Sequence, residues 1–217
     1  MNDIYISGTG IWTPPYKVSN DELVESFNKY VDLYNLEHTN EIKDGSIEPL
    51  VHSSSEFIVK ASGIKNRYVI EKEALLDPNR MKPQINARND DELSFTAEVS
   101  VIAAKEALNN AGLNPSDIDA VIVSAANLQR AYPAIAIEVQ NELGIEGFAY
   151  DMMVGCSAST FGINNAYCDI KSGKSSKVLV ISPEITSGHN NFKNRDGHFI
   201  FGDICTAVVI EKNSQSK

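Results

Sequence analysis

Cys156 is the residue whose neighbours in the sequence best suit covalent chemistry. The largely apolar run from Ala149 to Val154 is typical of a buried strand, and Gly155 separates it from a segment with helical periodicity. At the start of a helix, unpaired N–H groups and the positive end of the helix dipole stabilise a thiolate. A turn from strand to helix also projects a side chain out of the sheet. We therefore predict that Cys156 is a nucleophile rather than a small core residue.

The other two cysteines are expected to be small buried residues. Cys168 lies deep in the helix predicted after Cys156, and Cys205 begins a predicted strand. Three scattered cysteines supply neither a disulfide framework nor a CxxC metal-binding motif. Cys156 is thus the one cysteine for which we expect a chemical role.

The four histidines do not have the spacing of a metal site, so we expect no bound metal. His189 or His198 could complete a catalytic dyad with Cys156 if folding brought them together, and sequence alone leaves this open. We expect both in a loop that leads to the turn Phe201-Gly202-Asp203, where Asp203 would bond its own backbone.

The charge balance argues against a nucleic-acid-binding protein. The chain has 19 Lys and Arg against 29 Asp and Glu, a formal net charge of −10, whereas a phosphate backbone attracts a basic surface. Arg195 is either a solvated surface residue or a phosphate contact, for which the guanidinium fork is suited. Candidates for a local basic patch are Lys60, Lys65, Arg67, Arg88, Lys193 and Arg195.

Strand and helix patterns alternate along much of the chain, which indicates an α/β protein with a largely parallel sheet and helices on its faces. Segments 38–55 and 71–91 lack sustained periodicity and are expected to be surface insertions. The predicted strands are 4–12, 120–124, 148–154, 177–182 and 205–211, and the predicted helices are 20–36, 93–111, 134–143 and 156–171.

The helix predicted after Val154 is apolar nearly all round, so both of its sides should be covered, and a single sheet covers only one. We expect a second domain or a partner subunit to cover the other side. The polar end 211–217 resembles a linker. No basic leader precedes a long apolar run, so we expect a cytoplasmic protein without a membrane segment.

Several segments together resemble the β-ketoacyl-acyl-carrier-protein synthase III family, the initiating ketosynthases of the thiolase superfamily. Their order and spacing carry the resemblance, which covers nearly the whole chain apart from the two insertions. The matching segments are Ile6-Ser7-Gly8-Thr9-Gly10, Ser62-Gly63-Ile64-Lys65-Asn66-Arg67-Tyr68, Ala111-Gly112-Leu113 with Asp117-Ile118-Asp119, Tyr132-Pro133, Val154-Gly155-Cys156-Ser157-Ala158 and Phe201-Gly202-Asp203. The insertions, with Ser53-Ser54-Ser55-Glu56-Phe57 and Ser182-Pro183-Glu184, look most like the β-ketodecanoyl synthase subgroup.

The resemblance implies the N-terminal half of a thiolase-like fold, with a five-stranded mixed sheet between helices on both faces. It implies acyl transfer from acyl-CoA to a cysteine, followed by decarboxylative condensation with malonyl-acyl-carrier protein, and the β-ketodecanoyl subgroup implies a medium-chain acyl-CoA. Acyl-CoA and acyl carrier protein are then substrates, no cofactor is required, and a homodimer is expected.

Site roles follow from the same resemblance. Cys156 matches the acyl-accepting nucleophile, Phe57 and Arg195 match residues that contact CoA, and Tyr132 matches an aromatic residue that reaches the partner's acyl pocket. Phe201 would line the inner end of the site. Lys60-Ala61 departs from a Thr-Arg pair that helps to hold CoA. Lys65 and Arg67 are our candidates for carrier-protein docking.

The family's decarboxylating histidine and asparagine lie in a second, C-terminal half that residues 1–217 do not contain. We expect this chain to be the cysteine-bearing half, inactive alone in condensation. One alternative is a cysteine acyltransferase or hydrolase that uses His189 or His198. Another is a truncated, non-catalytic subunit that binds acyl-CoA or pairs with a full-length partner.

Overall fold

The computed structural model describes residues 4–89 and 91–212, and the chain forms two compact units. Unit 1 comprises the described residues of 1–13, 87–184 and 204–217, and unit 2 comprises residues 14–86 and 185–203. Each unit is described by itself. Among the described residues, no helix is both long and apolar enough to cross a membrane.

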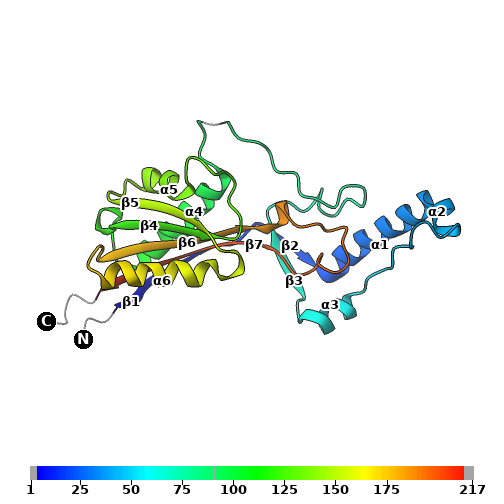
Figure 1. The fold of residues 1–217 in the computed structure, drawn as a ribbon, viewed down its shortest axis with the longest axis horizontal. Helices are drawn as coiled ribbons and strands as arrows, with labels where there is room; N and C mark the ends of the chain where they lie inside the picture. Colours follow the sequence, from blue (N-terminus) through cyan, green and yellow to red (C-terminus); the bar gives the residue numbers. More distant parts are fainter. Residues whose placement is uncertain (1–3, 90, 213–217) are drawn as a thin grey trace. The chain divides into compact units, whose positions relative to one another are not determined.

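Unit 1 is built on a five-stranded sheet with the order β1-β7-β6-β4-β5 (Figure 1). β4 pairs in parallel with both β5 and β6, while β1 pairs antiparallel with β7. The sheet is therefore mixed, because only the three strands joined through helices are parallel. The strands are β1 (Ile4–Trp12), β4 (Ala120–Ala125), β5 (Phe148–Met153), β6 (Lys177–Ile185) and β7 (Asp203–Lys212).

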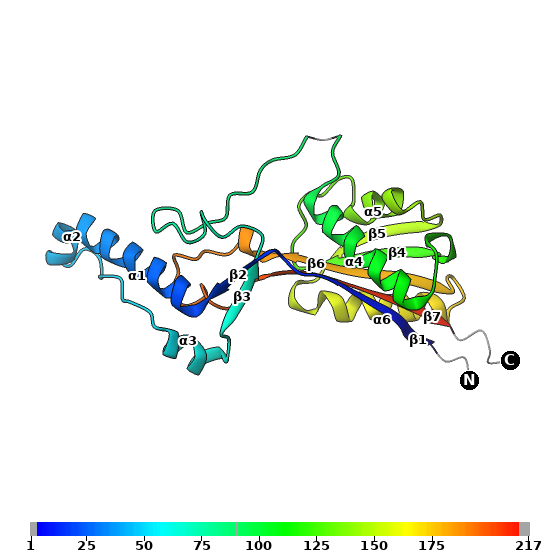
Figure 2. The same cartoon turned by 180° about the vertical axis from the view of Figure 1, so that it is seen from behind.

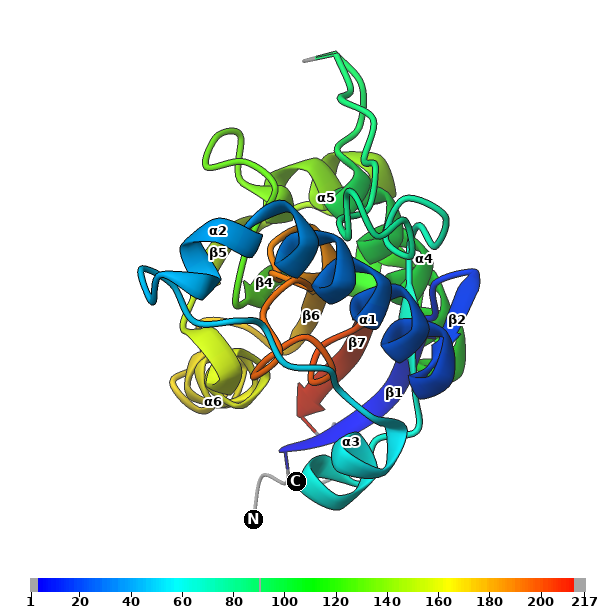
Figure 3. The same ribbon diagram turned by 90° about the vertical axis from the view of Figure 1, so that its right-hand side faces the viewer.

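Helices cover both faces of this sheet, as predicted. α4 (Phe95–Ala111) and α5 (Ile135–Leu143) lie on one face, and α6 (Ala158–Lys171) lies on the other (Figures 1 and 3). Every residue of β4, an interior strand of the sheet, is buried. The helix ends follow the sequence signals, because Gly112 and Gly144 end α4 and α5 with positive φ angles of 68° and 66°.

Two glycines let β1 approach α4 to backbone contact. A Cβ atom at Gly10 would lie 2.0 Å from the carbonyl oxygen of Ala103, and one at Gly8 would lie 2.2 Å from that of Ala107. Figure 2 shows β1 running beside α4 over this stretch. Any side chain at these positions would push the strand off the helix.

Unit 2 contains three helices and a two-stranded antiparallel sheet. α1 (Asn20–Glu37) begins with the predicted capping box of Ser19 and Glu22. The short strands β2 (Tyr16–Ser19) and β3 (Asn66–Val69) pair with each other. The remaining helices are α2 (Thr39–Lys43) and α3 (Ser55–Ser62), and none of β2, β3, α2 and α3 was predicted individually.

The segment 71–91, predicted to be a surface insertion, is partly buried. Its described residues form no helix or strand, yet Leu75 and Met81 are 0% and 2% exposed within the core of unit 2. They pack there with Phe27 of α1 and with Phe192 and Phe199. Because a few apolar side chains among polar neighbours leave no periodic signal, their burial could not be predicted from local pattern.

Candidate active site

Cys156 lies just after β5, at the edge of the sheet where the parallel strands β4, β5 and β6 have their carboxyl ends. Gly155, at a φ of 60°, turns the chain into a single 3₁₀ turn, Gly155–Ser157, and α6 follows. The structure thus places Cys156 in a one-turn helix before α6 rather than at the first residue of α6. The Cys156 side chain is exposed, as a nucleophile requires.

The start of α6 is fixed to the sheet by short polar side chains. The Ser124 hydroxyl on β4 donates to the Ala158 carbonyl at 2.6 Å, and the Ser159 hydroxyl donates to that of Ser182 on β6 at 2.9 Å. A Cβ atom at Gly162 would lie 2.8 Å from Val180, so this glycine allows close packing of the helix. These contacts hold the turn that carries Cys156.

α6 is buried on one side only. Its inner face carries Ala158, Gly162, Ala166 and Ile170, which are buried, whereas Phe161 and Tyr167 are 49% and 45% exposed. The predicted second covering is therefore not supplied by the described part of this chain. Cys168 lies on the exposed side, so the prediction that it is buried is wrong, because helical spacing turns it away from the sheet.

Cys205 is buried as predicted, and burial raises the pKa of its thiol to about 12. With iodoacetamide near neutral pH, we expect Cys156 to be alkylated fastest, Cys168 more slowly and Cys205 not at all. Peptide mapping of the modified protein measures the order. Faster labelling of Cys168 or Cys205 than of Cys156 would contradict the assignment of the nucleophile.

Tyr132 lies in the segment between β4 and α5, and its side chain is 89% exposed. The peptide bond between Tyr132 and Pro133 is cis. So exposed an aromatic ring has no packing role within the described chain and is free to contact another molecule.

Phe57 and Arg195, both matched to CoA contacts, come together in unit 2. The Arg195 guanidinium lies over the Phe57 ring, 4.2 Å from its centroid, and its Nε donates to the His52 carbonyl at 3.0 Å. The Phe57 ring meets that of Phe199 edge to face at 5.7 Å. A guanidinium on an aromatic face is a surface that suits a nucleotide ring and its phosphates. Phe201 is 44% exposed.

Of the two docking candidates, Lys65 is exposed but Arg67 is not. Arg67 is 4% exposed, and its guanidinium donates to the carbonyls of Val18 and Ser19 and to Oδ1 of Asn20. Burial lowers the pKa of Arg67 to about 10. The prediction of a docking role for Arg67 is therefore wrong, because its side chain joins β2 and α1 inside unit 2.

The histidines proposed as partners of Cys156 also belong to unit 2. His189 is exposed, whereas His198 is 0% exposed and its ring packs edge to face against Phe27 at 4.6 Å. A ring enclosed in the core of unit 2 is not available to a thiol elsewhere. No group of three potential metal ligands occurs among the described residues.

Three buried or half-buried carboxylates were not predicted. Asp203 accepts from the Ser187 N–H at 2.7 Å, the Ser187 hydroxyl at 2.6 Å and the Ile70 N–H at 2.9 Å, instead of bonding its own backbone. Asp151 and Glu184 accept backbone N–H groups of the segment that follows β4. A charged residue inside an otherwise apolar strand was the available signal.

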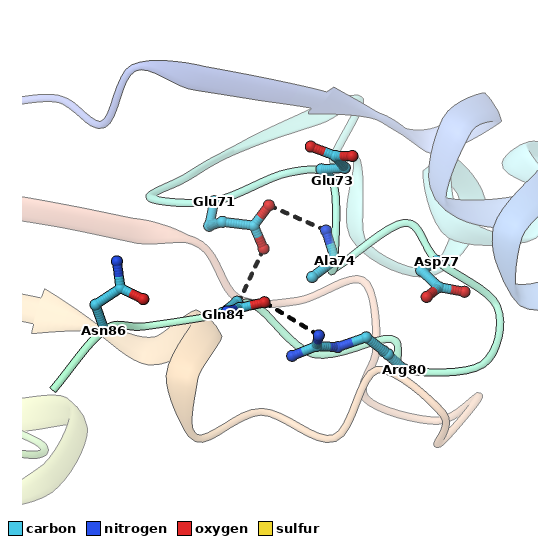
Figure 4. A pocket seen from close by; sticks show the side chains of 7 residues that line it. All are labelled: Glu71, Glu73, Ala74, Asp77, Arg80, Gln84 and Asn86. Atoms are coloured by element: carbon cyan, nitrogen blue, oxygen red, sulfur yellow. Dashed lines mark hydrogen bonds between the residues drawn. The ribbon is translucent and has the colours of Figure 1, made fainter.

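A cleft of about 570 Å³ opens in unit 2 beside the loop 71–86 (Figure 4). Its wall includes Glu71, Glu73 and Asp77, but the Glu71 carboxylate already accepts the N–H groups of Ala74 and Gln84, both at 3.0 Å. The lining contains no cysteine, histidine or serine. The cleft therefore offers no nucleophile.

Known proteins are similar to this chain in both sequence and fold. The family described as 3-oxoacyl-[acyl-carrier-protein (ACP)] synthase III matches residues 150–217. The β-ketodecanoyl-[acyl-carrier-protein] synthase of Pseudomonas aeruginosa is 54% identical over 189 residues, which are 87% of this chain and 54% of that protein. The β-ketoacyl-[acyl-carrier-protein] synthase III of Agrobacterium fabrum is 35% identical over 169 residues, which are 77% of this chain and 46% of that protein.

Among solved structures, 3-oxoacyl-[acyl-carrier-protein] synthase III from Aquifex aeolicus superposes with a TM-score of 0.72 at 27% identity. The match covers 98% of this chain and 55% of that one. The chain thus spans about half the length of the relatives it matches.

The mixed five-stranded sheet between helices is a thiolase-like α/β fold, as the motifs implied. Within that class, the chain is related in sequence to the β-ketoacyl-acyl-carrier-protein synthase III family. Its 54% identity to a β-ketodecanoyl synthase agrees with the subgroup suggested by the sequence around Phe57 and Glu184.

Proposed function

We propose that this chain is the cysteine-bearing part of a fatty-acid condensing enzyme that joins an acyl-CoA primer to malonyl-acyl-carrier protein. The observation that carries the proposal is the exposed Cys156, held at the carboxyl edge of three parallel strands in a chain related to synthases III. The identity to a β-ketodecanoyl synthase supports a medium-chain primer.

The first half-reaction moves the acyl group to the enzyme. The Cys156 thiolate attacks the thioester carbonyl of acyl-CoA, a tetrahedral oxyanion forms, and its collapse expels the CoA thiolate and leaves an acyl-cysteine. The backbone N–H of Cys156 is one donor for the oxyanion. Ser157, the N-cap residue of α6, makes no side-chain cap bond, and the N–H of Ala158 donates to the Gly155 carbonyl.

The second half-reaction forms the carbon–carbon bond. Malonyl-carrier protein loses CO₂, the resulting carbanion attacks the acyl-cysteine carbonyl, and the Cys156 thiolate leaves. Donors that stabilise this carbanion belong to the C-terminal half that we expect beyond residues 1–217. The exposed face of α6, with Phe161 and Tyr167, supports a covering by that half.

Each unit by itself carries candidate residues for substrate binding. Phe57 and Arg195 form a stacked pair suited to the adenine and phosphates of CoA. By the family resemblance, Phe201 is a candidate for lining the acyl site, and Tyr132 is a candidate for reaching the acyl pocket of a homodimer partner. Lys65 remains the docking candidate for the acidic carrier protein, since Arg67 is buried.

Acyl-enzyme trapping tests this function in the full-length natural protein. After incubation with a medium-chain acyl-CoA, we expect the acyl mass on the peptide that contains Cys156, and CO₂ release once malonyl-carrier protein is added. Cys156→Ala should reduce both signals to background, because no other exposed thiol lies at this turn.

Cys168→Ala is the matched control, since it removes an exposed cysteine from the same helix and should retain both signals. Acylation of another residue, hydrolysis of the acyl-enzyme without a malonyl donor, or Cys156 alkylation with no turnover would each contradict the proposal. The second result favours a cysteine hydrolase and the third a non-catalytic subunit.

A further inference from the structure

The segment 126–134, which joins β4 to α5 and carries the exposed Tyr132, is held at both ends by carboxylates from neighbouring strands. Neither carboxylate is close to the segment in sequence. Their geometry explains how a loop can present one aromatic ring to solvent in a defined place.

Asp151 of β5 holds the far end of the segment. Its Oδ2 accepts the Ile135 N–H at 2.7 Å and its Oδ1 accepts the Ala136 N–H at 2.8 Å. The N-cap residue of α5 is Ala134, whose methyl group cannot accept hydrogen bonds. Asp151, which lies on β5, therefore caps the N-terminus of α5, and its negative charge also faces the positive end of the helix.

Glu184 of β6 holds the near end. Its Oε1 accepts the Ala126 N–H at 2.7 Å, directly after the last residue of β4. Burial raises the pKa of Glu184 and that of Asp151. Half-buried carboxylates are costly to desolvate, and each of these two is paired with backbone N–H groups at an end of the segment.

A third contact fixes the middle of the segment. Oε1 of Gln129 accepts the N–H of Thr96 at 3.2 Å, at the start of α4. Tyr132 is then the exposed aromatic residue of a short loop with three fixed points, and its own ring is 89% exposed.

We propose that Asp151 and Glu184 are positioning residues that fix the segment 126–134 and thereby hold the exposed ring of Tyr132 in one place. The effect of this positioning on the choice of acyl primer rests on the proposed function; the positioning itself does not. Neither carboxylate touches the substrate, and each acts through Tyr132.

Amide hydrogen exchange tests the positioning on the 217-residue chain itself. Glu184→Met and Asp151→Ala should speed exchange across 126–136 by about tenfold or more, because each frees one end of the segment. Glu184→Gln keeps an acceptor for the Ala126 N–H and should exchange like the wild type. Glu142→Gln, an exposed change on α5, is the matched control. Unchanged exchange in Glu184→Met and Asp151→Ala would overturn the proposal.

Primer selectivity tests the consequence in the full-length protein. Glu184→Met and Tyr132→Ala should each change the ratio of kcat/KM between medium-chain and short-chain acyl-CoA by about tenfold, a size typical of hydrophobic pockets. The double variant should change it no more than either single one, because both act through the same ring. Glu184→Gln should restore the wild-type ratio.

The outcomes separate the two proposals. Additive effects, or a Glu184→Gln variant as damaged as Glu184→Met, would overturn the positioning role even in an active enzyme. A wild-type protein that accepts no acyl group contradicts the proposed function and, with it, the selectivity role of Tyr132. In that case the exchange rates alone decide whether the two carboxylates hold the segment.

Discussion

Gly10→Val is expected to unfold unit 1. The first side-chain carbon at this position would lie 2.0 Å from the Ala103 carbonyl oxygen and 2.6 Å from the Ala107 nitrogen, both backbone atoms of α4 that cannot move independently. Relief requires β1 to leave the helix, so we expect a loss of more than about 3 kcal/mol, a large part of the total stability of a domain.

Urea unfolding followed by circular dichroism measures this loss. Thr9→Val is the matched control, because Thr9 is the exposed neighbour of Gly10 on the same strand and valine is favourable in strands. We expect Thr9→Val to unfold at the wild-type urea concentration within error. A Gly10→Val protein with the wild-type midpoint would show that β1 does not approach α4 as closely as the structure indicates.

The helices and strands of unit 1 could be predicted because each carries its own local signals. α4 and α5 end at glycines, and β4 is an apolar run interrupted only by Ser124. The strands β2 and β3 could not, because four residues are too few for a periodic pattern and their pairing depends on contacts distant in sequence. The sheet is also mixed rather than largely parallel, since β1 pairs antiparallel with β7. The alternation of strands and helices could not predict this pairing, because it has no local signature in the sequence.

The residues of the candidate site likewise include some whose place could be predicted from local sequence and some whose place could not. The place of Cys156 between a strand and a helix could be predicted, because its strand, its glycine and its helix are adjacent in the chain. Arg67 could not, because an arginine in a short polar strand looks the same whether it faces solvent or the carbonyls of Val18 and Ser19. Asp151 and Glu184 act on backbone groups of another segment, and only the folded chain brings them there.

His198 is expected to make unit 2 sensitive to mild acid. Its ring is 0% exposed, packs against Phe27 and Phe199, and approaches the Ser53 hydroxyl at 3.4 Å. Burial, together with the positive charges of Arg67 and Arg195, lowers the pKa of His198 from 6.5 to about 4. The folded protein therefore keeps this ring neutral at a pH where the unfolded chain protonates it.

The sign of the effect follows from this difference. Below the unfolded pKa the unfolded state binds more protons than the folded state, so the free energy of unfolding falls as pH drops from 6.5 to about 4. A difference of this size corresponds to a loss of up to roughly 3 kcal/mol, since one pKa unit is worth about 1.4 kcal/mol. The contribution is fully present above the unfolded pKa.

The loss is measured by comparing urea unfolding of the wild type and of His198→Phe at about pH 7 and about pH 4.5, because phenylalanine fills the site and does not titrate. The raised pKa values of Glu184 and Asp203 act in the opposite direction, but both proteins contain these groups and the comparison cancels them. We expect the wild type to lose more stability than the variant over this range. His189→Gln, a change at an exposed histidine, should follow the wild type. Equal losses in the wild type and in His198→Phe would show that His198 is protonated as readily in the folded protein as in the unfolded chain.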